Sequence, residues 1–185
     1  MNNNNNPAPE ANGTENMFTT RIRTFSLISL ALALSALALS ACGDKQADIS
    51  AYENDVIVVS GLPGGDFTIT PKDLIALDCV SRTAAGATEK AGTVAATGPL
   101  LDTFLAEYGC KASDFDRIRF IASDGYRTVL RGDYLTDYEV VMSVSSGSEP
   151  LAEGLRPMRL LIPEAESGMW IYAVIRIEFV FPAQE

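Results

Sequence analysis

This chain of 185 residues contains no histidine. Cysteine and arginine are therefore the residues whose chemistry we consider first. The lack of histidine removes Ser-His-Asp and Cys-His nucleophiles, and also histidine-ligated zinc or non-haem iron. The cysteines are Cys42, Cys79 and Cys110. A cysteine thiolate is a good metal ligand, and two thiols can form a disulfide in an oxidising compartment.

Cys42 ends a segment with the three parts of an export signal. Met17 opens it, basic residues follow, and an apolar run spans residues 25–39. The run is shorter than the roughly 20 apolar residues that cross a membrane. Its end, Leu39-Ser40-Ala41-Cys42, resembles the lipobox of bacterial lipoproteins, in which the cysteine is acylated and becomes the mature N-terminus. An ordinary cleaved signal with a chance cysteine is the alternative.

The resemblance implies an exported protein anchored in a membrane by lipid on Cys42. Gly43, where inner-membrane lipoproteins have Asp, favours the outer membrane in a host with two membranes. Residues 1–16 are a polar run that we expect to be disordered and, with translation starting at Met17, not translated; a real polar extension is the alternative. We therefore predict a signal peptide at residues 17–41, a lipidated tether at 42–54 and a folded domain at 55–185.

The charge of the chain excludes one class of partner. Export removes two basic and two acidic residues, so the net charge of the mature chain stays at −10. Such a surface repels nucleic acid and acidic lipid headgroups. We therefore expect no nucleic-acid binding.

Cys79 and Cys110 allow three interpretations after Cys42 is acylated. A disulfide between them would close a loop of about 31 residues and stabilise the fold by about 3.5 kcal/mol. Alternatively, both thiols stay unbonded and half-buried, or Cys79 ligates a metal.

The arginines gather around a predicted hairpin at residues 117–131. Asp124-Gly125 suits a two-residue type I′ turn, which would place Ile118, Phe120 and Val129 on one face. The hairpin also carries Arg117, Arg119, Arg127 and Arg131.

Two interpretations fit these arginines. Guanidinium groups pair with carboxylate or phosphate, so they could line an anion pocket that Arg156 and Arg159 join. The favoured alternative is solvent-facing arginines paired with Asp116, Asp124 and Glu178. The aromatic side chains nearby are expected in the core rather than in a cleft, namely Tyr126, Trp170 and Tyr172.

Short strands and few helices must position these residues. Thr70-Pro71-Lys72-Asp73 has the pattern of a capped helix start, with the helix ending near Leu77. Apolar spacing predicts a second helix at 99–108, and a third turn of helix is expected at 133–137. Strands are predicted at 55–60, 67–69, 79–84, 93–97, 140–144, 158–162 and 169–181. This order predicts an α+β domain.

Five segments in order resemble the oxidoreductase molybdopterin-binding family, whose fold is that of the sulfite oxidase catalytic domain. They are residues 69–74, 98–105, 122–126, 156–163 and 169–171, the last leading to Ile177-Glu178. The resemblance implies an α+β fold with mixed and antiparallel β-sheets and a few short helices.

The family's active members bind molybdenum through a cysteine thiolate and grip the pterin phosphate with polar and basic side chains. Cys79 lies where that cysteine belongs, and Arg127, Arg156 and Arg159 are candidates to contact the cofactor. However, Leu155-Arg156 stands where the family typically has His-Gly, and Met169 replaces the lysine before the tryptophan. We therefore expect no molybdopterin, although it remains the alternative.

These observations predict a lipid-anchored cell-envelope protein that uses the domain as a binding or interaction module, with an envelope protein as partner. No residue is assigned a catalytic role, and Cys79 is the candidate if the domain is an enzyme. The alternatives are a small molybdenum-cofactor oxidoreductase that uses Cys79 as metal ligand, and a receptor for a small anionic ligand.

Overall fold

The computed structural model describes residues 47–86 and 92–183, which form one compact unit. The predicted extension at 1–16, the signal at 17–41 and Cys42 lie outside the described residues. Within the described ranges, no helix is both long and apolar enough to cross a membrane.

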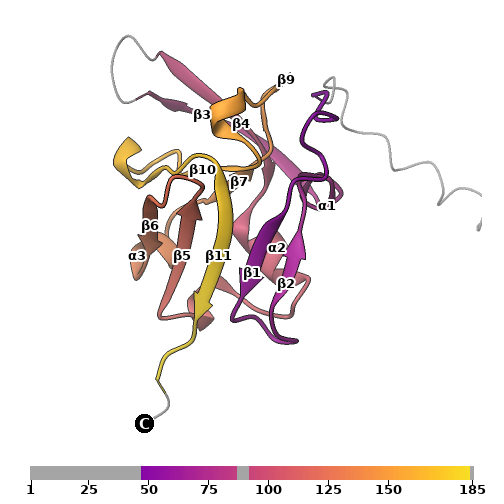
Figure 1. Cartoon of the computed structure of the whole chain (residues 1–185). Helices are drawn as coiled ribbons and strands as arrows, with labels where there is room; N and C mark the ends of the chain where they lie inside the picture. The colour runs from indigo at the N-terminus through magenta and orange to yellow at the C-terminus, as the bar shows by residue number, and fades with distance from the viewer. Residues whose placement is uncertain (1–46, 87–91, 184–185) are drawn as a thin grey trace, which may run out of the picture. The chain divides into compact units, whose positions relative to one another are not determined.

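The largest sheet has five strands in the order β2-β1-β11-β5-β6, and Figure 1 shows β11 between β1 and β5. β1 and β11 run parallel, and the other neighbours are antiparallel. The strands are β1 (Ile57–Ser60), β2 (Phe67–Ile69), β5 (Arg117–Ala122), β6 (Arg127–Leu130) and β11 (Val174–Val180).

Two smaller sheets complete the domain. One has the order β3-β4-β8-β9, with β3 (Cys79–Ala85), β4 (Thr93–Pro99), β8 (Ser145–Ser146) and β9 (Glu149–Pro150). The other pairs β7 (Val141–Ser143) with β10 (Arg159–Leu161). β4 and β7 approach closely at Gly98, where a side-chain Cβ would overlap the carbonyl oxygen of Met142.

The helices are short. α1 (Pro71–Ile75) has the predicted cap: the Thr70 hydroxyl accepts from the Asp73 N–H, and the Asp73 carboxylate accepts from the Thr70 N–H. The others are α2 (Leu101–Ala106), α3 (Asp133–Thr136) and three 3₁₀ turns, η2 (Ala112–Asp114), η3 (Glu153–Leu155) and η4 (Ser167–Met169). α2 is shorter than the predicted 99–108 helix because Pro99 still belongs to β4.

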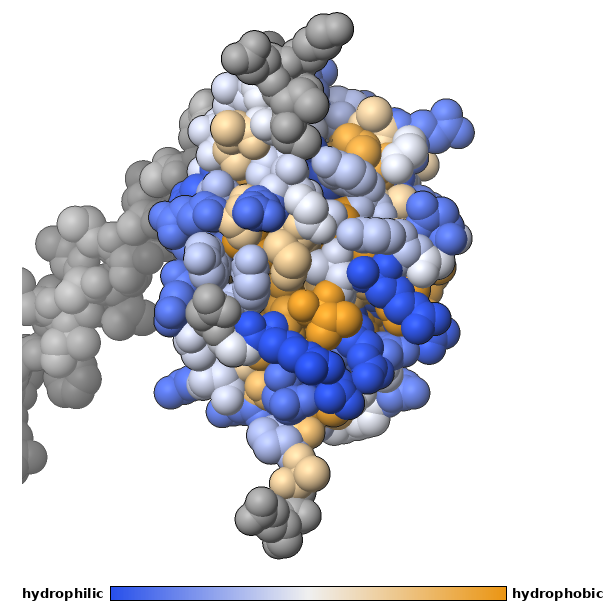
Figure 2. All heavy atoms as spheres, turned by 90° about the vertical axis from the view of Figure 1, so that its left-hand side faces the viewer, coloured by the Kyte–Doolittle hydropathy of each residue, from blue (hydrophilic) through white to orange (hydrophobic). Residues whose placement is uncertain are grey.

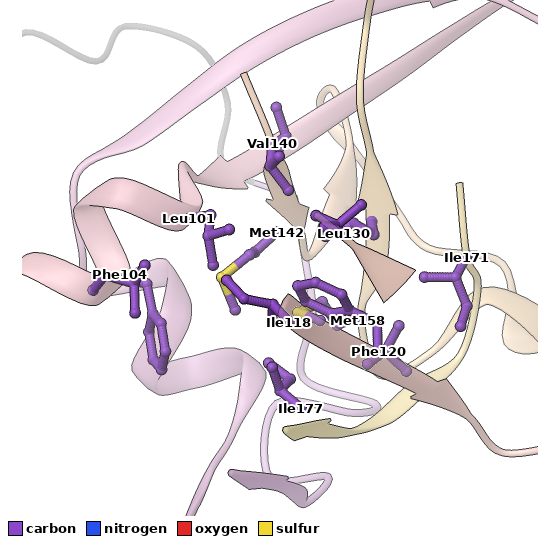
Figure 3. Close-up of a cluster of buried hydrophobic side chains, with 14 of the residues drawn as sticks. Leu101, Phe104, Ile118, Phe120, Leu130, Val140, Met142, Met158, Ile171 and Ile177 are labelled. Carbon is purple, nitrogen blue, oxygen red and sulfur yellow. The ribbon is translucent and has the colours of Figure 1, made fainter. Parts of the chain in front are cut away.

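The hydrophobic core lies between the five-stranded sheet, α2 and β7. Figure 3 shows Phe104 of α2, Phe120 of β5 and Met142 of β7 among the side chains that fill it. All three are at most 2 % exposed. Burial of such large side chains stabilises a fold by roughly 1.5–3 kcal/mol each, so this core is the main support of the domain.

The hairpin of β5 and β6 is confirmed, but its predicted turn is wrong. Ile118 pairs with Leu130 and Phe120 with Thr128, so Val129 lies opposite Arg119, on the other face from Phe120. The loop holds three residues, Ser123 to Gly125, and Gly125 takes the left-handed conformation with φ of 84°. This three-residue loop is the common alternative to a two-residue turn, and one extra residue moves every β6 side chain to the opposite face.

The predicted tether at 42–54 is too long. Within it, Ala47, Ile49 and Tyr52 are buried and pack against Leu151. The Tyr52 hydroxyl donates to the Val144 carbonyl oxygen at 2.7 Å and accepts from the Leu151 N–H at 2.9 Å. Residues 47–54 are therefore part of the folded domain.

Candidate functional site

Cys79 opens β3, four residues after the end of α1. Its half-buried sulfur lies 3.9 Å from the carbonyl oxygen of Leu74 and 4.0 Å from that of Ile75, with the thiol as donor. A carbonyl oxygen accepts a hydrogen bond from a thiol but offers no favourable contact to a thiolate. Both contacts use the thiol as a hydrogen-bond donor, whereas a metal would bind the deprotonated thiolate.

Cys110 lies on a different element, directly after the turn that closes α2. It is buried, and its Sγ lies 3.6 Å from the Tyr108 carbonyl oxygen. The structure contains no disulfide between Cys110 and Cys79.

Arg156 contacts the N-terminal segment of the domain. Its guanidinium carbon lies 4.7 Å from the ring centroid of Tyr52, and its Nε donates to the Leu151 carbonyl oxygen at 2.8 Å. A guanidinium over an aromatic ring is a favourable cation–π contact. Arg156 thus fastens residues 47–54 to the loop before η3.

Arg159 is the most buried arginine that the structure describes, with 3 % of its surface exposed. It lies in β10, and its Nη2 donates to the Ala95 carbonyl oxygen in β4, while its Nε has no hydrogen-bond partner. Burial lowers the pKa of Arg159, and the nearby Tyr172 partly opposes that effect. No described carboxylate forms an ion pair with it.

Arg127 is exposed on β6, away from these groups. Two other arginines of the sheet are ion-paired as predicted: Arg117 with Asp116 at 2.8 Å and Arg119 with Glu178 at 3.3 Å. The third predicted partner, Asp124, instead accepts from the Tyr126 N–H within the hairpin loop.

The predicted cofactor residues do not form one cradle. Cys79, Arg156 and Arg159 each donate to backbone carbonyl oxygens of the protein itself, and Arg127 lies in the five-stranded sheet. No cluster of three or more candidate metal ligands occurs among residues 47–86 and 92–183. The residues present therefore do not fit a dianionic pterin cofactor at Cys79.

A surface groove of about 660 Å³ lies elsewhere, along α2 and η2. Cys110, Lys111 and Asp102 line it, whereas Cys79 and the three candidate arginines do not. The groove therefore does not bring the predicted cofactor residues together.

The predictions for the aromatic side chains are confirmed for one residue and wrong for two. Trp170 is buried and its Nε1 donates to the Ile162 carbonyl oxygen at 2.9 Å, as expected of a core residue. Tyr126 and Tyr172 are 53 % and 43 % exposed, so their placement in the core was wrong. Both lie just outside strands, Tyr126 before β6 and Tyr172 before β11, so strand alternation does not apply to them.

Sequence reasoning missed Tyr52 and Arg176. Tyr52 sits in a polar stretch that resembled a linker, and only its bonds to Leu151 and Val144 reveal its role. A β-bulge between Val174 and Arg176 sets Arg176 opposite Ile121, on the outer face of the sheet. The alternation of Arg176 and Glu178 with Ile177 and Phe179 was the available signal for the outward placement of Arg176.

Comparison with known proteins gives a structural likeness. No family model matches the sequence, and no curated protein is similar to it. Among solved structures, the chain is similar to the sulfane dehydrogenase SoxCD from Paracoccus pantotrophus, with 20 % sequence identity and a TM-score of 0.55. The match covers 69 % of this chain and 38 % of that one, so the chain spans well under half of its length.

At that identity the likeness concerns the fold. The α+β class, with mixed and antiparallel sheets and few short helices, is confirmed. The similarity to a dehydrogenase domain also supports the distant molybdopterin-oxidoreductase-like fold that the sequence motifs indicated.

Proposed function

We propose that this chain is a lipid-anchored cell-envelope protein whose molybdopterin-oxidoreductase-like domain works as a binding module without the molybdenum cofactor. One observation carries the proposal. The thiol and the two arginines expected nearest the cofactor, Cys79, Arg156 and Arg159, all donate to the protein's own carbonyl oxygens.

Those contacts have a physical consequence for cofactor binding. A pterin phosphate gains affinity from charge-assisted hydrogen bonds to guanidinium groups. Arg156 holds its Nε on the Leu151 carbonyl oxygen and its guanidinium over the Tyr52 ring, so turning the whole group toward a pterin would break both contacts. The Leu151 carbonyl oxygen would then lose this donor, and a carbonyl group left buried without a partner costs about 1–3 kcal/mol.

The anchor is the second part of the proposal and rests on the sequence alone. Acyl chains on Cys42 would hold the protein in a membrane, with about 0.8 kcal/mol gained per buried CH₂ group. We propose the outer membrane for a host with two membranes, because Gly43 follows the cysteine. The partner would be another envelope protein.

A test combines two measurements on the mature chain purified from a host that makes molybdopterin. Mass spectrometry of the N-terminal peptide should find acyl chains on Cys42, and Cys42→Ser should abolish them. The fluorescence of oxidised pterin released from the wild type should be no higher than that from the Cys79→Ser variant. An unmodified Cys42 would contradict the lipid anchor. A pterin signal that depends on Cys79 would contradict the absence of the cofactor.

A receptor for a small anion is the second candidate, favoured by Arg159. Its buried Nε has no acceptor, and no described carboxylate neutralises its charge. A small anion beside Arg159 would supply both the missing hydrogen-bond acceptor and the missing counter-charge. Millimolar formate or inorganic phosphate should then raise the melting temperature of the wild type and leave that of Arg159→Met unchanged. No shift with either anion rejects this candidate.

A further inference from the structure

The positive charge of the domain is concentrated on one face. Strand alternation and register place four arginines on the outer face of the five-stranded sheet, and we call this surface the arginine face: Arg117, Arg119, Arg127 and Arg176. The buried Phe120 and Ile177 mark the opposite, inner face. The whole mature chain nevertheless has a net charge of −10, so the rest of the surface is strongly acidic.

Part of this charge is not neutralised. Glu178 is the carboxylate within the arginine face, and it pairs with Arg119; Asp116 at the strand entrance pairs with Arg117. Arg127 and Arg176 are exposed and form no ion pair with another described residue. Arg131, directly after β6, is likewise exposed and unpaired among the described residues.

The arginine face is also partly apolar. Ile121 lies between Arg127 and Arg176 in the register, Val129 lies opposite Arg119, and both aliphatic side chains are only half-buried. Figure 2 views the side on which β6 and α3 lie in Figure 1, and shows strongly hydrophilic residues around a small apolar patch. Arginine beside aliphatic side chains suits an anionic surface with an apolar layer beneath it.

The position of Cys42 indicates which partner the arginine face contacts. Four residues separate Cys42 from Ala47, which is already buried in the domain. Five peptide steps reach at most about 18 Å, so a lipid on Cys42 would keep the domain beside the membrane. A tethered body with one basic face and a net negative charge lowers its energy by turning the basic face toward an anionic bilayer.

We propose that the arginine face rests on the anionic lipid headgroups of the membrane that holds the Cys42 lipid. This inference depends on the lipid anchor of the proposed function and adds an orientation to it. The overall charge of −10 still repels the bilayer, so the anchor supplies the proximity and the arginine face supplies the orientation. The rest of the surface, which carries the net negative charge, is then presented to the aqueous compartment.

The experiment uses the mature acylated protein reconstituted in vesicles of phosphatidylcholine, with or without about one third phosphatidylglycerol. Phenylglyoxal modification followed by mass spectrometry reports the accessibility of each arginine. Phosphatidylglycerol should slow modification of Arg127, Arg131 and Arg176 by at least about threefold, and leave Arg82 unchanged. High salt should remove the protection.

Matched variants separate this surface from overall charge. Arg127→Gln/Arg176→Gln and Lys72→Gln/Lys111→Gln each remove two exposed positive charges. The first should abolish the protection of Arg131, and the second should preserve it. The melting temperature of each variant in detergent checks that both remain folded.

Three results would overturn the inference. One is equal modification of the three arginines on both kinds of vesicle, and another is protection of Arg131 in the arginine variant. The third is protection by soluble hexaglutamate with none by phosphatidylglycerol, which would assign the surface to an acidic protein. An acylated chain without lipid-dependent protection rejects the orientation alone, whereas an unacylated chain rejects the anchor as well.

Discussion

Arg159 of β10 donates a hydrogen bond to the Ala95 carbonyl oxygen of β4, and so joins two sheets through a buried cation. Burial lowers the pKa of this guanidinium, and its Nε has no acceptor. A buried charge without a counter-ion contributes little to stability, because desolvation offsets the gain from its contacts.

Arg159→Met should therefore change the free energy of unfolding by less than about 1 kcal/mol, because methionine fills the space and removes the desolvated charge. Arg159→Ala should lower it by about 3 kcal/mol through the cavity left behind. Urea unfolding measures both values. A loss above about 2 kcal/mol in the methionine variant would show that the guanidinium itself holds the sheets together.

Gly98→Ala should destabilise the domain by about 3 kcal/mol, because its Cβ would overlap the Met142 carbonyl oxygen and force β4 away from β7. Gly154→Ala is the matched control: nothing lies within 4 Å of its Cβ. The control should change stability by less than about 0.5 kcal/mol. Equal losses in the two variants, measured by thermal unfolding, would contradict the close approach of these strands.

Tyr52→Phe should lower the free energy of unfolding by about 1–3 kcal/mol, because the Leu151 N–H and the Val144 carbonyl oxygen lose their buried partner. The Tyr126→Phe variant is the control, since its hydroxyl makes only an exposed contact of 3.4 Å. Chemical denaturation of both variants provides the measurement. If Tyr52→Phe is as stable as the wild type, residues 47–54 are a tether after all.

Glu139 gives a pH dependence of known sign. Hydrogen bonds from Arg82, at 2.6 and 2.9 Å, lower the pKa of Glu139 below that of an ordinary glutamate. The resulting stabilisation is complete above the ordinary pKa and disappears as the pH falls through the lowered one. Both side chains are over one third exposed, so it amounts to about 0.5 kcal/mol.

The free energies of unfolding of wild type and Glu139→Gln should accordingly differ by about 0.5 kcal/mol at neutral pH and converge as the pH falls through the lowered pKa of Glu139. The exposed Glu107→Gln serves as control and should show no such convergence. Unfolding curves measured across this range test the prediction. A difference that persists at low pH would mean that the glutamate acts through packing rather than charge.

The elements with local signals were predictable from the sequence. The capping box of α1 depends on Thr70 and Asp73 only three residues apart, and it forms as expected. The pairing of Arg117 with Asp116 is equally local. Turn length was less accessible, because Asp124-Gly125 is compatible with loops of two or three residues and only cross-strand pairing decides between them.

Contacts between distant segments lay beyond sequence reasoning. Arg156 and Arg159 were grouped with the hairpin arginines, yet they contact Leu151 and Ala95 instead. The sequence offers no signal for which carbonyl oxygen a buried guanidinium will reach. The bulge that turns Arg176 outward is of the same kind, because it depends on the register with β5.

The molybdenum content of the purified mature chain tests the central claim most directly. The protein should be made in a host that supplies molybdenum cofactor, with the Cys79→Ser variant prepared in parallel. We predict a molybdenum content indistinguishable between the two and far below one atom per chain. Molybdenum approaching one atom per chain in the wild type, and lost in the variant, would contradict the account and identify an oxidoreductase.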